Sequence, residues 1–107
     1  MKMLELASVI LDIKNIVSET PDVIKRVGIF GSLAKNSFTD QSDIDIVVEY
    51  ATTLDFDYNR YTLFCKACNN IMDSISENYG RNVDILHVQQ EHPDSLIHEI
   101  QDEVVWV

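Results

Sequence analysis

The segment that most restricts the fold is the apolar run at 44–50, IDIVVEY, which begins beside two aspartates, Asp43 and Asp45. Its middle is made of β-branched residues, a composition typical of a strand. Side chains alternate between the two faces of a strand, so Ile44 and Ile46 are predicted to face the core while both aspartates point the other way. We therefore expect a buried strand that carries two carboxylates on one face at its start.

The rest of the chain alternates between helical and strand patterns. The expected elements are a helix at about 3–18, a strand near 27–30, a helical turn at 32–35, the strand at 44–50, a long helix that follows Asp57 and is capped by Gly80, a strand at 81–88, and a helix after Pro93. We find no repeat, low-complexity tract or linker. A chain of 107 residues with this order is predicted to form one α/β or α+β domain with a single small sheet.

The composition excludes several classes of function. The net charge of −10 argues against binding nucleic acid over a broad surface, because phosphate contacts need lysine and arginine. It fits a basic protein partner or a site that gathers cations, and it also fits a role in solubility alone. No apolar run reaches about 18 residues, so no membrane span is predicted. Glu5 and Asp12 interrupt the apolar start, which is interpreted as a helix and not as a signal peptide; we expect a cytoplasmic protein.

Two cysteines, Cys65 and Cys68, form the pair C-x-x-C within the second long helical pattern. A zinc site needs two more ligands at a suitable spacing, and the sequence has no second pair. A redox role of the thioredoxin type would place the pair at the start of a helix. We interpret the two residues as core thiols in a reducing compartment.

Carboxylates are the chemically most informative side chains. Asp43 and Asp45 repel each other on a rigid strand, which a fold tolerates when a cation lies between them, and few hard oxygen ligands suit Mg²⁺. Asp84, in the apolar sequence VDIL, joins them if the two strands are neighbours. Three carboxylates suffice for two divalent ions in phosphoryl chemistry, and Asp84 could accept the proton of an attacking hydroxyl. An Asp-x-Asp pair at a strand edge also has a purely structural interpretation, as a solvated edge or a cap.

Gly31 and Ser32 follow the first predicted strand. A glycine there lets the backbone turn sharply and approach a ligand, and the start of the next helical turn presents free N–H groups to a phosphate. The Ser32 hydroxyl adds a donor, and Lys35 is near enough in sequence to assist. A Gly-Ser pair after a strand is also an ordinary turn.

The combination is more specific than its parts. Gly-Ser, ten further residues, Asp-x-Asp and a third Asp on a later strand resemble the nucleotidyltransferases of the DNA polymerase β superfamily, most of all their minimal nucleotidyltransferase (MNT) domains. The resemblance covers nearly the whole chain. It implies one MNT domain at 1–107, with a small mixed sheet flanked by helices.

The resemblance also assigns roles to residues. It implies that Gly31 and Ser32 bind phosphate, and that Asp43, Asp45 and Asp84 are the catalytic and metal-binding carboxylates. Lys35 and Asn36 stand where the family usually has Arg-Gly. Lysine keeps the charge but loses the bidentate fork, and asparagine tolerates a left-handed backbone, so we expect the turn to survive with altered phosphate binding.

MNT domains commonly accompany HEPN proteins in two-component toxin–antitoxin systems. The resemblance implies an antitoxin that transfers AMP from ATP, with two Mg²⁺ ions, to a tyrosine hydroxyl of a HEPN ribonuclease toxin. The alternative is a catalytically weak antitoxin that neutralises the HEPN toxin by direct binding. A transferase of the antibiotic-modifying kind needs a second domain for its acceptor, and 107 residues leave no room for one.

Overall fold

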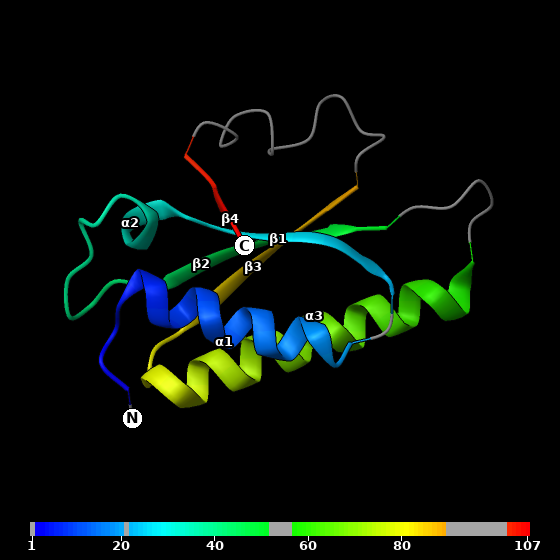
Figure 1. Cartoon of the computed structure of the whole chain (residues 1–107), viewed down its shortest axis with the longest axis horizontal. Helices are drawn as coiled ribbons and strands as arrows, with labels where there is room; N and C mark the ends of the chain where they lie inside the picture. The colour runs from blue at the N-terminus through cyan, green and yellow to red at the C-terminus, as the bar shows by residue number, and fades with distance from the viewer. Residues whose placement is uncertain (1, 21, 52–56, 90–102) are drawn as a thin grey trace.

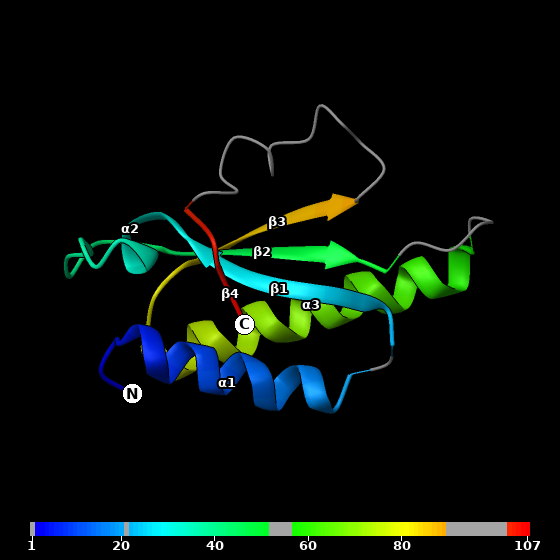
Figure 2. The same ribbon diagram turned by 45° about the horizontal axis from the view of Figure 1, so that its top comes forward.

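The computed structural model describes residues 2–20, 22–51, 57–89 and 103–107. Its elements are α1 (Leu6–Ser18), β1 (Ile24–Phe30), α2 (Gly31–Ala34), β2 (Ile44–Tyr50), α3 (Tyr58–Tyr79), β3 (Val83–Gln89) and β4 (Val105–Trp106). The strands form one sheet in the order β3-β2-β1-β4. Helices α1 and α3 lie side by side along one face of this sheet (Figures 1 and 2). The predicted α/β class with one small sheet is confirmed.

Strand directions bring three chain segments to one end of the sheet. β1 pairs with β2 in antiparallel fashion, with Phe30 opposite Asp45. β2 pairs with β3 in parallel fashion, with Asp45 opposite Asp84, and α3 supplies the crossover between the two strands. The sheet is therefore mixed, and the end of β1 meets the starts of β2 and β3. Residues that follow β1 come to lie beside residues that begin β2 and β3.

The main core lies between the sheet and the two long helices. Ile44, Ile46 and Val48 point into it and are fully buried, as the alternation along β2 predicts. From α3, Phe64, Ile71 and Ile75 reach the same core. Burying side chains of this size contributes about 1.5–3 kcal/mol each, so this contact fixes the helices on the sheet.

The other face of β2 is also buried beyond its aspartates, which the sequence pattern did not predict. Val47 and Val88 form a second apolar cluster with Phe30, Leu86, Val104 and Trp106 packed against it. Trp106 belongs to β4, a short strand that pairs with β1 opposite Gly28. Residues 105–106 thus form a strand, where the predicted element order ended in a helix. The helix predicted after Pro93 falls outside the described residues.

Glu49 is a carboxylate of β2 that is only 2% exposed. Its Oε1 lies 3.3 Å from the Arg26 guanidinium, and its Oε2 lies 3.5 Å from Lys25 Nζ. Arg26 also stacks over the Trp106 ring, 3.7 Å from its centroid. Burying a charge is tolerated when opposite charges accompany it, and these two cations supply them.

Local signals at the helix ends behave as the sequence predicts. The Asp57 side chain caps the start of α3 by accepting a hydrogen bond from the Arg60 N–H at 3.2 Å. Gly80 ends α3 in the left-handed region, with φ +63°, and its N–H donates to the Ser76 carbonyl. Asn36 also has a positive φ, of 56°, so the turn after α2 survives the replacement of the usual glycine.

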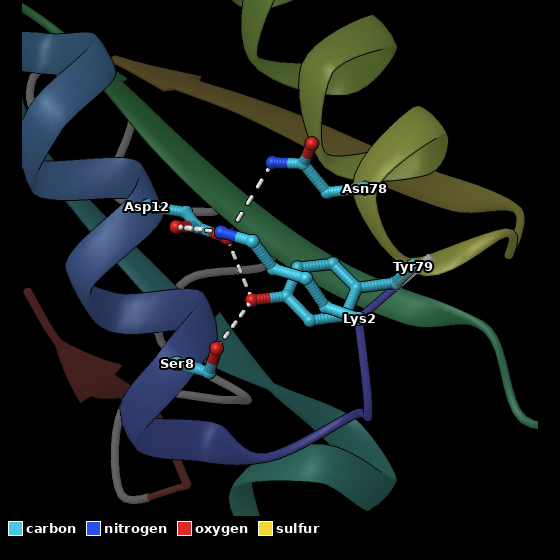
Figure 3. Close-up of polar contacts among 5 residues, drawn as sticks. All are labelled: Lys2, Ser8, Asp12, Asn78 and Tyr79. Carbon is cyan, nitrogen blue, oxygen red and sulfur yellow. Dashed lines mark hydrogen bonds and ion pairs between the residues drawn. The ribbon is translucent and has the colours of Figure 1, made fainter.

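A partly buried polar network joins α1 to the end of α3 (Figure 3). Asp12 Oδ1 accepts from Lys2 Nζ at 2.8 Å, and its Oδ2 accepts from the Tyr79 hydroxyl at 2.6 Å. Asn78 Nδ2 lies 3.5 Å from the same oxygen, and the Tyr79 hydroxyl is 2.9 Å from Ser8 Oγ. Burial alone would raise the pKa of Asp12, but its donors, Lys2 and Tyr79 foremost, hold that pKa below the ordinary value. The acidic residue within the apolar stripe of α1 therefore has satisfied partners.

Both cysteines lie within α3 as free thiols, Cys65 half-buried and Cys68 buried. Burial, and then the neighbouring Cys65, raise the pKa of Cys68 to about 12. This environment keeps the thiol protonated and agrees with the interpretation of a core thiol. No helix among the described residues is long and apolar enough to cross a membrane.

Candidate active site

Gly31 is placed where the end of β1 turns beside the carboxylate of Asp45. Its backbone is left-handed, with φ +72°, a conformation that side-chain-bearing residues rarely adopt. A Cβ atom at this position would also collide with Asp45 Oδ2. Glycine is thus required here both by the backbone conformation and by the close approach of a carboxylate.

Ser32 lies in the single turn of α2 that follows, and it is half-buried. Its carbonyl accepts from the Ser37 N–H at 2.9 Å, which closes the turn onto itself. The first N–H groups of a helical turn have no partner within the helix, so they and the serine hydroxyl are the donors that this turn offers. Through Gly31, the predicted phosphate-binding pair therefore lies beside Asp45.

The structure brings together the three aspartates that the sequence singled out. Asp43 is exposed just before β2, Asp45 is half-buried in β2, and Asp84 is exposed in β3. Asp45 and Asp84 are Cα partners across the parallel pair. Burial raises the pKa of Asp45, and the charges of Asp84 and then Asp43 raise it further. The repulsion that was expected between these residues is therefore present at Asp45.

The three carboxylates suit a hard divalent cation that is also coordinated by water and phosphate. They do not form a complete metal site made of protein ligands alone. Among the residues that the structure describes, no three acidic, histidine or cysteine side chains form a ready-made metal site. Mg²⁺ does not require one, because it keeps several waters and is usually held by one or two carboxylates together with substrate phosphates. Burial is the main cause of the raised pKa of Asp45, and a cation beside Asp43, Asp45 and Asp84 would relieve the repulsion that raises it further. The residues therefore fit this ion.

Lys35 follows α2 directly, and the structure pairs it with a residue that sequence reasoning missed. Its Nζ lies 3.1 Å from Glu103 Oε1, and both side chains are about half exposed, at 53% and 42%. Exposed pairs of this kind contribute about 0–1 kcal/mol, so the contact is weak enough to yield to a phosphate. No local signal pointed to Glu103, because it is distant in sequence.

Arg81 is the second residue that sequence reasoning missed. It lies in the turn between α3 and β3, and its Nη1 donates to the carbonyls of Thr39 and Ser42 at 2.7 and 2.9 Å. A cavity of about 380 Å³ lies at this position, lined by 40–43, Ser76 and 80–82. Asp43 lines the cavity as well, so Arg81 borders the candidate site.

A glycine turn that faces carboxylates of two adjacent strands, on a mixed sheet backed by helices, is the arrangement expected of a nucleotidyltransferase. The family model for polymerase beta nucleotidyltransferases matches residues 12–107. The chain belongs to this family, as its signature predicts.

Curated relatives carry the same assignment. Two proteins of Methanocaldococcus jannaschii, both provisionally named protein adenylyltransferases, align over most of their lengths. One is 29% identical over 84 residues, covering 78% of this chain and 77% of that protein. The other is 34% identical over 85 residues, covering 74% of this chain and 78% of that protein. These relatives and the family support the predicted class of activity, nucleotidyl transfer.

Solved structures confirm the fold. A crystal structure of a toxin–antitoxin with AMP-PNP aligns with a TM-score of 0.62 at 18% identity, covering 94% of this chain and 71% of that one. A mutant form of the MntA-HpeT toxin–antitoxin aligns with a TM-score of 0.60 at 17% identity, covering 90% and 69%. At these identities the likeness concerns the fold, and the fold is the one predicted for an MNT domain.

Proposed function

We propose that this protein is an antitoxin that transfers AMP from Mg²⁺-ATP to a tyrosine hydroxyl of a partner HEPN toxin. The observation that carries the proposal is the meeting of Gly31, Asp45 and Asp84 at one end of the sheet. Membership of the polymerase beta nucleotidyltransferase family supports the chemistry. Relatives named for protein adenylylation, and toxin–antitoxin neighbours in fold, support a protein as the acceptor.

The turn after β1 holds the part of ATP that leaves. Backbone N–H groups at Gly31 and Ser32, with the serine hydroxyl, donate to the terminal phosphates. Lys35 adds a positive charge when it leaves Glu103 and binds a phosphate. The contacts from the turn and from Lys35 together stabilise the departing pyrophosphate. The turn thereby orients ATP with its α-phosphate toward the aspartates.

The aspartates act at the α-phosphate of ATP, where the transfer takes place. Asp43, Asp45 and Asp84 would hold Mg²⁺, which neutralises charge on the phosphates when it is bound. Asp84 accepts the proton of the attacking hydroxyl. The hydroxyl oxygen forms a bond to the α-phosphorus while the bond to pyrophosphate breaks, so the acceptor gains AMP and pyrophosphate departs. The whole domain, 1–107, serves as the nucleotide half of the site, and the partner supplies the acceptor.

A second candidate is an antitoxin that neutralises its toxin by contact alone. Two observations favour it. Lys35 is engaged by Glu103, which competes with phosphate, and the net charge of −10 suits binding to a basic partner surface. In this case the carboxylates are retained without transfer.

Intact mass spectrometry of the partner separates the two candidates. The protein is incubated with a HEPN partner and Mg²⁺-ATP, and the partner is then weighed. Transfer predicts added mass in multiples of one AMP unit, located on tyrosine. Asp84→Asn should abolish the added mass while the complex still forms. Asp73→Asn, which removes the same charge from an exposed position on α3, is the matched control and should transfer normally.

Neutralisation of the toxin without any change of mass, equally by the wild-type protein and by Asp84→Asn, would refute transfer and leave the contact mechanism. Added mass that persists in Asp84→Asn would refute the role of this residue as the proton acceptor. Added mass located on a residue other than tyrosine would refute the acceptor assignment alone.

A further inference from the structure

We propose that Arg81 is a positioning residue that holds Asp43 in the geometry needed to bind the metal; this inference rests on the proposed function. Asp43 lies just outside β2, which begins at Ile44, so the register of the sheet does not include it. Its position depends on the turn that precedes it. Arg81 reaches across from the α3–β3 turn and binds two carbonyls of that turn.

The contact is made at the residue that adjoins the aspartate. Arg81 Nη1 donates to the Ser42 carbonyl, which belongs to the peptide group linking Ser42 to Asp43, at 2.9 Å. It also donates to the Thr39 carbonyl at 2.7 Å, so one nitrogen holds both ends of the turn. Within the turn, the Thr39 N–H donates to Ser42 Oγ at 2.8 Å. The turn is closed by its own side chains and is fixed to the fold by Arg81.

Arg81 can act as an anchor because its own backbone is held. The Ser76 hydroxyl of α3 donates to the Arg81 carbonyl at 2.7 Å, and the Ser76 carbonyl accepts from the Gly80 N–H at 2.8 Å. The backbone carbonyl of the next residue, Asn82, accepts a hydrogen bond from the Ile44 N–H at 3.0 Å. A continuous set of hydrogen bonds thus runs from α3 through Arg81 to the start of β2. The same set leads into β3, which carries Asp84.

Arg60 provides a matched comparison within the same chain. It is also half-buried, and its Nη2 donates to two backbone carbonyls, those of Asp22 and Ala51, at 2.6 and 3.3 Å. Ala51 follows the opposite end of β2 from the aspartates. Removing either guanidinium therefore deletes two bonds from a side chain to the backbone, but only Arg81 adjoins a proposed metal ligand.

The direction in which metal affinity changes when Arg81 is replaced distinguishes a positioning role from a purely electrostatic one. Deleting a positive charge beside carboxylates should strengthen the binding of a divalent cation if Coulombic attraction alone is at work. A positioning role predicts the opposite, because a ligand that is no longer held binds less well. Loss of groups that orient metal ligands typically weakens metal affinity about 10- to 100-fold.

The experiment measures Mn²⁺ binding to the free protein by electron paramagnetic resonance, with Mn²⁺ in place of Mg²⁺ and a non-hydrolysable ATP analogue present. Arg81→Met, which keeps an unbranched apolar stem, should raise the dissociation constant about tenfold. Arg60→Met should change it less than twofold, although both variants should melt at a lower temperature. Arg81→Lys retains a donor and should recover part of the affinity.

The inference is overturned if Arg81→Met binds Mn²⁺ as tightly as the wild-type protein or more tightly, if Arg60→Met weakens binding equally, or if the wild-type protein binds no Mn²⁺. Should Arg81→Met fail to fold, Arg81→Lys and Ser76→Ala decide the question, since each loosens the same set of bonds and should weaken binding to a smaller degree. Because no toxin and no transfer are involved, failure of the proposed adenylylation would appear separately, as an absence of added mass on the partner.

Discussion

Asp45 on β2 and Asp84 on β3 are direct partners across a parallel pair of strands. Like charges opposite one another destabilise a sheet, and the pKa of Asp45 is raised, by burial first and then by Asp84 and Asp43. Relief of this repulsion is the basis of the first prediction.

Replacing both aspartates of β2, Asp43→Asn with Asp45→Asn, should abolish transfer while preserving or raising the free energy of unfolding. The expected gain is about 0.2–1 kcal/mol, the range for cross-strand pairs. Urea unfolding in the presence of a chelator measures it. A double variant that fails to fold would mean that these side chains hold the sheet together, and the metal site would lose its main support.

Gly31→Ala should destabilise the fold and impair nucleotide binding. A left-handed backbone at alanine costs about 1–2 kcal/mol, and the added methyl group collides with the Asp45 carboxylate. Asn36→Ala is the matched control, because Asn36 has a positive φ in the turn after α2. Calorimetry with Mg²⁺ and an ATP analogue should show loss of binding for Gly31→Ala alone. Equal loss in both variants would assign the effect to strain and not to the carboxylate.

Glu103→Gln should lower the KM for ATP, because it frees Lys35 to bind phosphate. Lys35→Met should raise the KM, and adding Glu103→Gln to Lys35→Met should then have no further effect. The stability of the fold should change by less than about 1 kcal/mol in each case, as for exposed ion pairs. Steady-state kinetics of pyrophosphate release checks this. A KM that is unchanged in Lys35→Met would remove Lys35 from the nucleotide site.

Ionisation of the Tyr79 phenol should lower the free energy of unfolding at alkaline pH. Burial, and then its hydrogen bond to Asp12, raise the pKa of Tyr79 to about 12 from the ordinary value of 10.0. The folded protein therefore binds more protons than the unfolded chain between these values, and stability falls as the pH rises from 10 to 12. Tyr79→Phe should lose about 1.5–3 kcal/mol at neutral pH, as for a hydrogen bond to a charged group, and should show a shallower alkaline decline.

Denaturant unfolding at a series of pH values measures this difference. The pKa of Cys68 is also raised to about 12, so its contribution is present in both proteins and cancels when the two curves are subtracted. Parallel curves for the wild-type protein and Tyr79→Phe above pH 10 would show that the phenol does not titrate differently on unfolding.

Local signals in the sequence located most of the fold and the parts of the site that depend on single segments. β2 was predicted with the bounds that the structure shows, Asp57 and Gly80 frame α3, and the left-handed turn at Asn36 follows from its residue type. In each case the cause lies within a few residues, in alternation, capping or a backbone preference.

Features that depend on pairing between distant segments escaped prediction. β4 contains only two residues, too few for alternation to show, although its β-branched and aromatic composition fits a strand. The bonds from Arg81 to Thr39 and Ser42, and the pairing of Lys35 with Glu103, join residues that are far apart in the sequence. The periodicity of apolar residues does not predict such contacts, because they depend on the order of strands in the sheet.

The parallel pairing of β2 with β3 joins segments that are made at different times during synthesis. The turn at Gly31 and the first two aspartates leave the ribosome before α3, and Asp84 follows only after it. Closing a crossover of this length requires the loop entropy to be overcome before the pairing stabilises it. A nascent chain that has not docked β3 carries the phosphate turn but lacks the residue proposed to take the proton. In the proposed mechanism, the residue that takes the proton therefore joins the site only when the sheet is completed.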